Sequence, residues 1–189
     1  MQQNNKMYVL WNRLKYVLSP QFDIYSQVSR VVSGKVADVG SGTGFGTHLL
    51  TINARSVHGF EVDADAIQFA KKVFPFKKLR FDFGDITKEI PGQFDFVIMI
   101  DVIEHIKHDR KALENAKKML AKNGTLILST PNRLSRYRKA ETHYREYAPK
   151  EFEGILKRVF VSVDLRNYQM ELLVSQYENP VLAICKNVK

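Results

Sequence analysis

The sequence predicts an α/β domain with a mostly parallel sheet, helices on both faces and an antiparallel hairpin at the C-terminal end. Three observations carry this prediction. Short apolar runs alternate with helical patterns from residue 35 to residue 129, an order typical of parallel sheets. The run FDFVIMI at residues 94–100 is apolar throughout, as expected of a strand covered on both faces. The last two apolar runs, at residues 161–168 and 180–186, have no helical pattern between them.

The same patterns place the individual elements. Ser19-Pro20 separates two N-terminal helical patterns, because proline ends one helix and suits the start of the next. Asn123-Gly124 is expected to end a helix, and residues 169–179 are interpreted as further strand and a turn. The predicted strands are residues 35–39, 56–62, 79–83, 94–100, 125–129, 161–168 and 180–186, and the predicted helices after the N-terminal pair are 45–52, 64–74, 109–120 and 149–160.

Composition is that of an ordinary globular protein of one domain, with 189 residues, 44% hydrophobic and 26% charged. No apolar run approaches the roughly 20 residues of a membrane helix, and no signal-peptide core is present near the first residue. The single cysteine, Cys185, excludes an internal disulfide and favours a reducing, cytoplasmic location. The net charge of +9 attracts anions, nucleic acid included, although it is spread along the chain as on a solvated surface.

A glycine-rich turn follows the first predicted strand and opens the next helix. It reads VADVGSGTGFG over residues 36–46, with glycine at the alternate positions Gly40, Gly42 and Gly44. Glycines allow a tight turn and close approach to a ligand, and the helix N-terminus beyond presents free N–H groups to an anion. Phe45 stands where a dinucleotide-binding loop needs glycine, and no Gly-Lys-Ser/Thr completes a P-loop.

The heptapeptide DVGSGTG at residues 38–44 resembles the first motif of class I S-adenosylmethionine-dependent methyltransferases, and the resemblance extends over nearly the whole chain. It implies a Rossmann-like fold and S-adenosylmethionine as the cofactor. It also implies that Asp38 holds the loop and the methionine amino group of the cofactor. The loop backbone that would pass beside the methionine moiety belongs to Gly40, Ser41, Gly42 and Gly44.

Acidic residues at strand ends extend the cofactor site, because ligands of open parallel sheets bind beyond the carboxyl ends of the strands. Glu61 lies 21 positions after Gly40, matching the spacing of about 20 for a carboxylate that accepts both ribose hydroxyls. The resemblance implies that Asp85 accepts from the adenine amino group and that Ile86 packs on the ring. Val62 is included in the predicted site. Asp63 is a weaker candidate that equally suits capping of the helix from residue 64, and Asp82 suits strand structure.

The segment DVIEHI at residues 101–106 would lie beside the transferable methyl group in the resembled family. Asp101 is therefore a candidate cofactor contact. Glu104 and His105 are candidate catalytic residues, because histidine has a near-neutral pKa and suits proton removal from an acceptor. The alternative is structural, with one side chain holding the turn and the other packing beneath it.

The basic and aromatic stretch after the fifth strand is expected to cover the acceptor pocket. Residues 142–152, THYREYAPKEF, resemble a motif of the branch that includes ubiquinone-biosynthesis O-methyltransferases and bacterial sugar or lipid methyltransferases. The resemblance makes His143, Tyr144 and Arg145 candidate acceptor contacts, with His143 also a catalytic candidate. The alternative is that they order the loop against the sheet.

A divalent metal is kept as an alternative to a metal-independent site. Asp101, Glu104, His105 and His143 resemble, imperfectly, the acid and histidine set of metal-dependent small-RNA 3′-terminal 2′-O-methyltransferases. Two carboxylates and two imidazoles suit a divalent ion that grips vicinal hydroxyls. That family has glutamate where this chain has Asp101, and the surroundings of its second histidine differ.

The prediction is one methyltransferase domain acting on a small-molecule acceptor, with a hydroxyl as the expected target. An RNA 2′-O-methyltransferase is an alternative that the basic charge fits, although the chain lacks a recognisable RNA-binding module. A non-catalytic cofactor-binding module is a second alternative. Within the single domain of residues 1–189, residues 1–33 would form N-terminal helices, 34–131 the cofactor-binding half, and 132–189 the acceptor-side lid and C-terminal hairpin.

Overall fold

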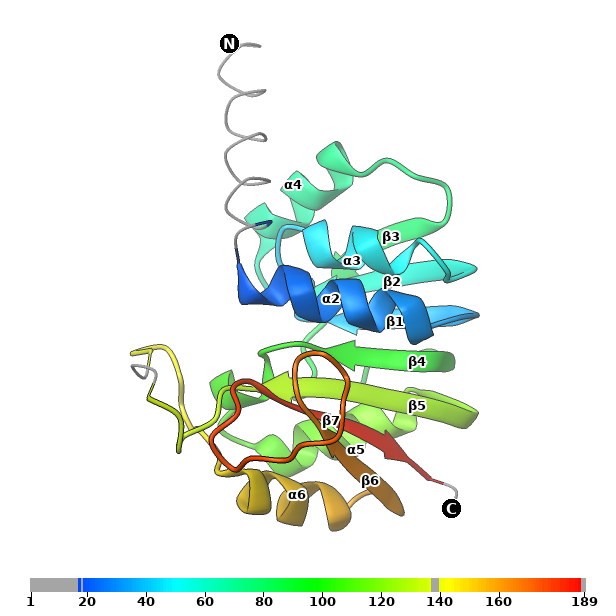
Figure 1. The fold of residues 1–189 in the computed structure, drawn as a ribbon. Helices are drawn as coiled ribbons and strands as arrows, with labels where there is room; N and C mark the ends of the chain where they lie inside the picture. Colours follow the sequence, from blue (N-terminus) through cyan, green and yellow to red (C-terminus); the bar gives the residue numbers. More distant parts are fainter. Residues whose placement is uncertain (1–16, 18, 137–139, 188–189) are drawn as a thin grey trace.

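The computed structural model describes residue 17, residues 19–136 and residues 140–187. Its strands form one seven-stranded sheet in the order β3-β2-β1-β4-β5-β7-β6 (Figure 1). The first five strands pair in parallel, and β7 runs antiparallel between β5 and β6, which confirms the predicted mixed sheet and C-terminal hairpin. The strands are β1 Lys35–Val39, β2 Ser56–Glu61, β3 Leu79–Phe83, β4 Phe94–Met99, β5 Leu120–Thr130, β6 Ser162–Arg166 and β7 Val181–Lys186.

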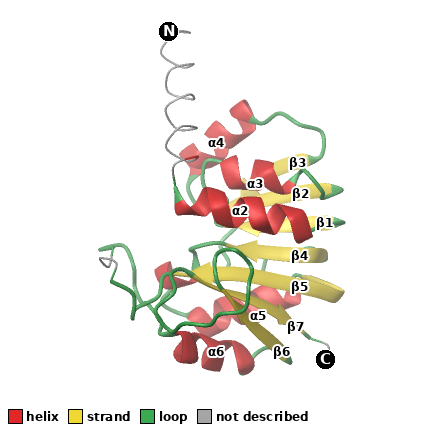
Figure 2. Cartoon of the chain, viewed as in Figure 1, coloured by secondary structure: helices red, strands yellow, loops and turns green. Residues whose placement is uncertain are grey.

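Helices cover both faces of the sheet (Figure 2). Successive side chains of β4 explain why, since Val97 and Met99 join one apolar cluster while Ile98 joins the other. The cluster with Ile98 includes side chains of α2, α3 and α4, and the opposite cluster includes side chains of α5 and α6. The helices are α2 Pro20–Val31, α3 Phe45–Leu50, α4 Ala64–Val73, α5 Asp109–Lys118 and α6 Pro149–Lys157, with a 3-10 turn η1 at Ile103–His105.

The prediction that Asn123-Gly124 ends a helix is wrong, because both residues lie inside β5. The helix α5 ends at Lys118, and the strand begins two residues later. The pairing of β5 with β4 is irregular at this place. A Cβ at Gly124 would stand 2.8 Å from the carbonyl oxygen of Phe94, so this glycine permits close approach of two strands.

Two further predicted segments differ from the structure. Residues 169–179 form a loop with one isolated bridge, Arg166 to Leu172, and no strand of their own. Asn132 holds this loop through hydrogen bonds from its side-chain amide to the carbonyls of Gln176 and Glu178. The second N-terminal helix is confirmed as α2, whereas the first falls on residues outside the described part of the chain.

Within the described residues, no helix is both long enough and apolar enough to cross a membrane. Cys185 is buried in β7, and burial raises the pKa of its thiol far above the usual value. Its side chain belongs to the apolar cluster that includes α5 and α6, so it acts in packing.

Candidate functional site

The glycine-rich loop joins β1 to α3 and is pinned to the neighbouring strand. The amides of Gly40 and Ser41 both donate to the carbonyl of Phe60, at 2.8 and 3.1 Å. Gly40 has φ +76°, and a Cβ there would stand 2.5 Å from Val102, so no larger residue fits without displacement. Gly42 also has a positive φ, but a Cβ there would meet nothing within 4 Å. The loop backbone is therefore closely packed at Gly40, whereas space is left beside Gly42.

Glu61 meets this loop from the end of β2, as the sequence predicts. Its Oε2 accepts a 2.8 Å hydrogen bond from the amide of Gly42. Its Oε1 accepts from the amides of Val62 and Asp63, at 2.7 and 3.1 Å. A carboxylate has about four lone-pair positions, so Glu61 is oriented by the backbone and keeps capacity for a further donor.

A cavity of about 480 Å³ opens beside the loop at the ends of β1, β2, β3 and β4. Asp85 stands at its edge and accepts from the amide and the hydroxyl of Thr87, at 2.9 and 2.7 Å. The hydrogen bond from the Thr87 hydroxyl lowers the pKa of Asp85 most, and the bond from the Thr87 amide acts in the same direction. The Asp85 carboxyl therefore stays ionised at neutral pH. The cavity is lined by Val39, Gly40, Glu61, Val62, Gly84, Asp85, Ile86, Thr87, Val102, His105, Ile106, Lys107 and His108.

Some predicted residues lie around this cavity and not on its wall. Ser41 is buried, and its Oγ has no hydrogen-bond partner among the described residues. Gly44 begins α3, where a Cβ would meet the ring of Phe81 at 2.7 Å. The lining lacks Asp38, Ser41, Gly42, Gly44, Asp101, Glu104 and His143.

Asp38 is fully buried at the end of β1 and ties two helices to the strand. It accepts hydrogen bonds from the hydroxyls of Tyr25 on α2 and Thr47 on α3, at 2.9 and 2.7 Å. Burial raises the pKa of Asp38 to about 7, although both hydrogen bonds act in the opposite direction. Tyr25 and Thr47 were missed by sequence reasoning, because neither belongs to a local motif with Asp38.

Asp101 follows β4 in a left-handed conformation, φ +53°, which is unusual for a residue with a side chain. One of its oxygens accepts from the hydroxyl of Ser129 at 2.6 Å, and that hydroxyl accepts from the Asp101 amide. The other oxygen accepts from the side-chain amide of Gln21 at 2.9 Å. Asp101 is thus clamped between β5 and α2, and Gln21 is a second residue that no sequence signal indicated.

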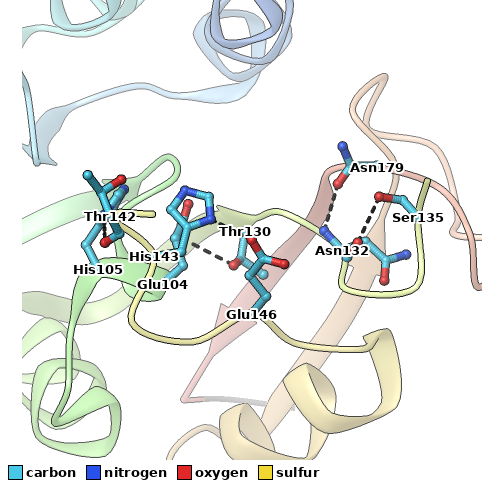
Figure 3. A network of polar contacts seen from close by, with 9 residues as sticks. All are labelled: Glu104, His105, Thr130, Asn132, Ser135, Thr142, His143, Glu146 and Asn179. Atoms are coloured by element: carbon cyan, nitrogen blue, oxygen red, sulfur yellow. Dashed lines mark hydrogen bonds and ion pairs between the residues drawn. The ribbon is translucent and has the colours of Figure 1, made fainter. Parts of the chain in front are cut away.

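Glu104, His105 and His143 come together where the loop after β5 passes η1 (Figure 3). One potential ligand atom of each lies within 4.8 Å of the others. The two rings meet edge to face, with centroids 4.9 Å apart. His105 Nδ1 lies 3.0 Å from the carbonyl of Thr142, and His143 Nδ1 lies 2.7 Å from a carboxylate oxygen of Glu146.

Glu104 is the buried member of this group. Its Oε2 accepts a 3.3 Å hydrogen bond from the hydroxyl of Thr130, while its Oε1 has no partner among the described residues. Burial raises the pKa of Glu104 to about 8, and the nearby carboxylates of Asp101 and Glu146 act in the same direction. The side chain is therefore largely neutral at pH 7 in the protein alone.

The contacts of Arg145 support the alternative that this segment orders the loop against the sheet. Its guanidinium lies 3.4 Å from Asp109 and over the ring of Tyr147, and its amide donates to the carbonyl of Glu104. Tyr144 is exposed, with the ammonium of Lys107 6.0 Å from its ring centroid. Both residues lie along the surface of the loop.

Two other acids make structural contacts. Asp63, open between a cofactor contact and a helix cap, caps α4 by accepting from the amides of Asp65 and Ala66. Asp82 of β3, predicted to be structural, pairs with His58 of β2 and Lys71 of α4. These contacts leave Glu61 and Asp85, at the ends of β2 and β3, as the acids that line the cavity.

A family model described as a methyltransferase domain matches residues 32–169. A Mycolicibacterium smegmatis protein named "Probable S-adenosylmethionine-dependent methyltransferase" is 27% identical over 59% of this chain and 44% of its own length. A Bacillus cereus protein named "Uncharacterized methyltransferase" is 29% identical over 61% of this chain and 55% of its own length. The aligned region therefore spans about half of the length of these two relatives. A crystal structure titled an S-adenosylmethionine-dependent methyltransferase, from Clostridium acetobutylicum, superposes with TM-score 0.75 at 16% identity, covering 97% of this chain and 98% of that one.

Proposed function

This chain belongs to the methyltransferase domain family, and we propose from this premise that it transfers a methyl group from S-adenosylmethionine to a hydroxyl of a small acceptor. Membership confirms the resemblance that residues 38–44 indicated. The observation that carries the proposal is the meeting of the Gly42 amide with Glu61, at 2.8 Å, beside a cavity that Asp85 also lines. A turn and two acids from three different strand ends thus surround one space.

The residues around the cavity suit an adenosyl group. Glu61 already accepts from three backbone amides and keeps about one of its four lone-pair positions, on Oε2, for a ribose hydroxyl. Asp85 is held ionised by Thr87 and can accept from the adenine amino group, while Ile86 supplies an apolar wall. Asp38 and the open space at Gly42 fit the methionine end, whose amino group is a cation. The bound cofactor supplies an electrophilic methyl group on its sulfonium.

We propose that His105, Glu104 and His143 act on the acceptor hydroxyl. A carbonyl oxygen can only accept, so the Nδ1 of His105 carries the hydrogen that binds the Thr142 carbonyl. This leaves the Nε2 of His105, a residue of the cavity lining, with the lone pair that could take the proton of an acceptor hydroxyl. His143 and Glu104 pack against this ring and position it.

Calorimetric titration with S-adenosylmethionine tests the cofactor half of the proposal. We expect one equivalent to bind, and Glu61→Ala and Asp85→Asn each to weaken binding at least tenfold, because each removes an acceptor of charge-assisted hydrogen bonds. Glu114→Ala is the matched control, since Glu114 is a carboxylate on α5 paired with Arg110 away from the cavity. Equal affinities for all four proteins would remove the proposed site.

A methyl-transfer screen with labelled cofactor tests the acceptor half. We expect labelling of a hydroxylated metabolite, independent of ionic strength apart from weak screening. Labelling of RNA that falls steeply with salt would replace the small-molecule proposal with a nucleic-acid one. Cofactor binding without transfer to any metabolite or RNA would favour a non-catalytic module.

A further inference from the structure

We propose that the end of the sheet opposite the cavity binds the surface of a membrane that contains anionic lipids. Three segments form this end, residues 30–35, 51–55 and 74–80, and we refer to them together as the basal surface. Figure 1 shows the ends of α2 and α3 and the connection from α4 to β3 where β1, β2 and β3 begin, whereas the cavity lies where these strands end. Membrane binding at this place does not depend on the proposed methyl transfer.

Hydrogen bonds join the three segments of the basal surface. The amide of Arg55 donates to the carbonyl of Gly34 at 2.8 Å, which joins the turn after α3 to the turn after α2. The ammonium of Lys78 donates to the carbonyls of Thr51 and Ala54, which joins the turn after α3 to the connection before β3. The three segments therefore lie side by side at one end of the molecule.

Each segment of the basal surface exposes one large apolar side chain. Val31 is 48% exposed, Ile52 64% and Phe76 47%. A single exposed apolar residue is ordinary, but three on adjoining segments form a patch that an apolar phase would remove from water. The ring of Phe76 stacks on His48 with centroids 5.0 Å apart, so it loses less conformational freedom on binding than an unsupported ring would.

Cations accompany the apolar side chains on all three segments. The exposed cations are Arg30, Lys35, Arg55, Lys77, Lys78 and Arg80. The three segments contain no aspartate or glutamate, and among the described residues none of these cations forms an ion pair with a carboxylate. Asp95 of β4 is an acid at this end, where it accepts from the amide of Lys35 at 2.7 Å. The basal surface is therefore strongly positive.

The combination of cations and aliphatic side chains favours an anionic membrane over other anionic partners. Lysine and arginine bind anionic headgroups, while apolar side chains enter the layer between headgroups and acyl chains. A nucleic acid would use the cations and the Phe76 ring, but it offers no apolar layer for Val31 and Ile52. A second copy of this chain would bring like charges together.

The orientation that this contact imposes is compatible with an accessible cavity. With the basal surface on the membrane, the ends of β1, β2 and β3 point away from it. The cavity and the loop of residues 140–148 would then face the surrounding water, so the membrane would not block entry to the cavity.

Cosedimentation of the 189-residue chain with lipid vesicles tests the charge requirement. We expect binding to vesicles of equimolar phosphatidylglycerol and phosphatidylcholine, weaker binding as salt rises, and little binding to phosphatidylcholine alone. Lys77→Gln should weaken binding about fivefold and Arg55→Gln/Lys77→Gln about 25-fold, because each cation near an anionic surface contributes about a factor of five.

Lys111→Gln/Lys150→Gln is the matched control for charge. It removes the same charge from exposed positions in the first turns of α5 and α6, which begin at the opposite end of the sheet. We expect vesicle affinity to change by less than about twofold, because these positions lie beyond the screening length from the membrane.

Ile52→Ser tests the apolar requirement and should weaken vesicle binding about tenfold. Leu172→Ser is its matched control, because Leu172 is 61% exposed but lies beside the end of β6, away from the basal surface. Urea unfolding should give the same midpoint for both variants and the wild type, since both side chains are exposed.

Absence of binding to the anionic vesicles, equal binding to both kinds of vesicle, or equal weakening by the control variants would overturn the proposal. Single-stranded RNA is the competing probe. Binding of RNA that Lys77→Gln weakens, without vesicle binding, would assign the basal surface to nucleic acid instead. Self-association that Ile52→Ser abolishes, again without vesicle binding, would assign it to a second copy of the chain.

Discussion

The proposed cofactor side, around the glycine-rich loop and Glu61, and the proposed acceptor side, around Glu104, His105 and His143, are built in different ways. On the cofactor side, backbone amides of the glycine loop contact acids at adjacent strand ends, as between Gly42 and Glu61. On the acceptor side, the cluster depends on the loop segment of residues 140–148, which brings His143 to Glu104 and His105. The strand ends and the glycine-rich loop therefore position Glu61 and Asp85, whereas the catalytic candidates also need a segment from beyond β5.

The largest contrast between the two sides is expected from glycine substitutions. Gly40→Ala places a Cβ 2.5 Å from Val102 at φ +76°, so strain and overpacking should cost about 2–4 kcal/mol of unfolding free energy. We also expect S-adenosylmethionine binding to be lost in this variant. Urea unfolding and cofactor calorimetry measure the two effects.

Gly154→Ala is the matched control for that experiment. Gly154 is exposed in α6, where a Cβ meets nothing within 4 Å, so alanine should stabilise the helix by up to about 1 kcal/mol. Cofactor affinity should stay unchanged. Similar destabilisation by both substitutions would mean that the glycine loop carries no special constraint.

His105→Asn is expected to separate the two sides in kinetics. If His105 is the proposed proton acceptor, its loss should lower kcat about a hundredfold and change S-adenosylmethionine affinity by less than a factor of about three. Single-turnover methyl transfer under saturating cofactor measures the chemical step. A fall in cofactor affinity as large as the fall in kcat would assign His105 to the cofactor side instead.

The buried acid on the cofactor side predicts a pH dependence. The pKa of Asp38 is about 7 in the folded protein against 3.8 as the ordinary value, so between these pH values the folded state binds more protons than the unfolded state. The protonated Asp38 side chain therefore contributes fully to the free energy of unfolding below about pH 4. This contribution is lost as the pH rises through 7. Asp38→Asn should remove this component, so the wild type should lose about 2 kcal/mol more than the variant between pH 5 and pH 8.

Urea unfolding of both proteins at the two pH values measures this difference. Parallel loss of stability in the wild type and the variant would contradict the raised pKa of Asp38. Binding of the cationic amino group of the cofactor near Asp38 should favour its ionised form, so calorimetry in buffers of different ionisation enthalpy should detect proton release near neutral pH.

The smallest expected effect comes from breaking the hydrogen bond between Gln21 of α2 and Asp101, which follows β4. Gln21→Ala removes the 2.9 Å hydrogen bond to Asp101 and should cost about 1 kcal/mol of unfolding free energy. Because Asp101 keeps its bond to Ser129, we expect only a two- to fivefold loss of kcat. An effect as large as that of His105→Asn would show that α2 takes a direct part in catalysis.

The sequence predicts that the glycine-rich loop, Glu61 and Asp85 lie close together, because the signals for these positions are local and in register. The loop motif, the spacing of Glu61 from Gly40, and the position of Asp85 after a strand suffice, since parallel strands bring their carboxyl ends to one edge. Thr87 could also have been found, because an acid two residues before a threonine is typical of an Asx turn.

Other contacts carry no signal in the sequence. Tyr25 reaches Asp38 from a separate helix, and Gln21 reaches Asp101 across 80 positions, so only tertiary packing brings them together. Asn123-Gly124 matches a helix stop locally, yet the close approach of the Phe94 carbonyl is what requires the glycine. Long-range packing therefore overrides turn chemistry at that point.

A crystal structure of the protein with S-adenosylhomocysteine tests the central claim most directly. We expect the ribose hydroxyls within hydrogen-bond distance of Glu61, the adenine between Asp85 and Ile86, and the homocysteine end beside Gly42. An adenosyl group bound elsewhere, with the space between Glu61 and Asp85 left to water, would contradict it.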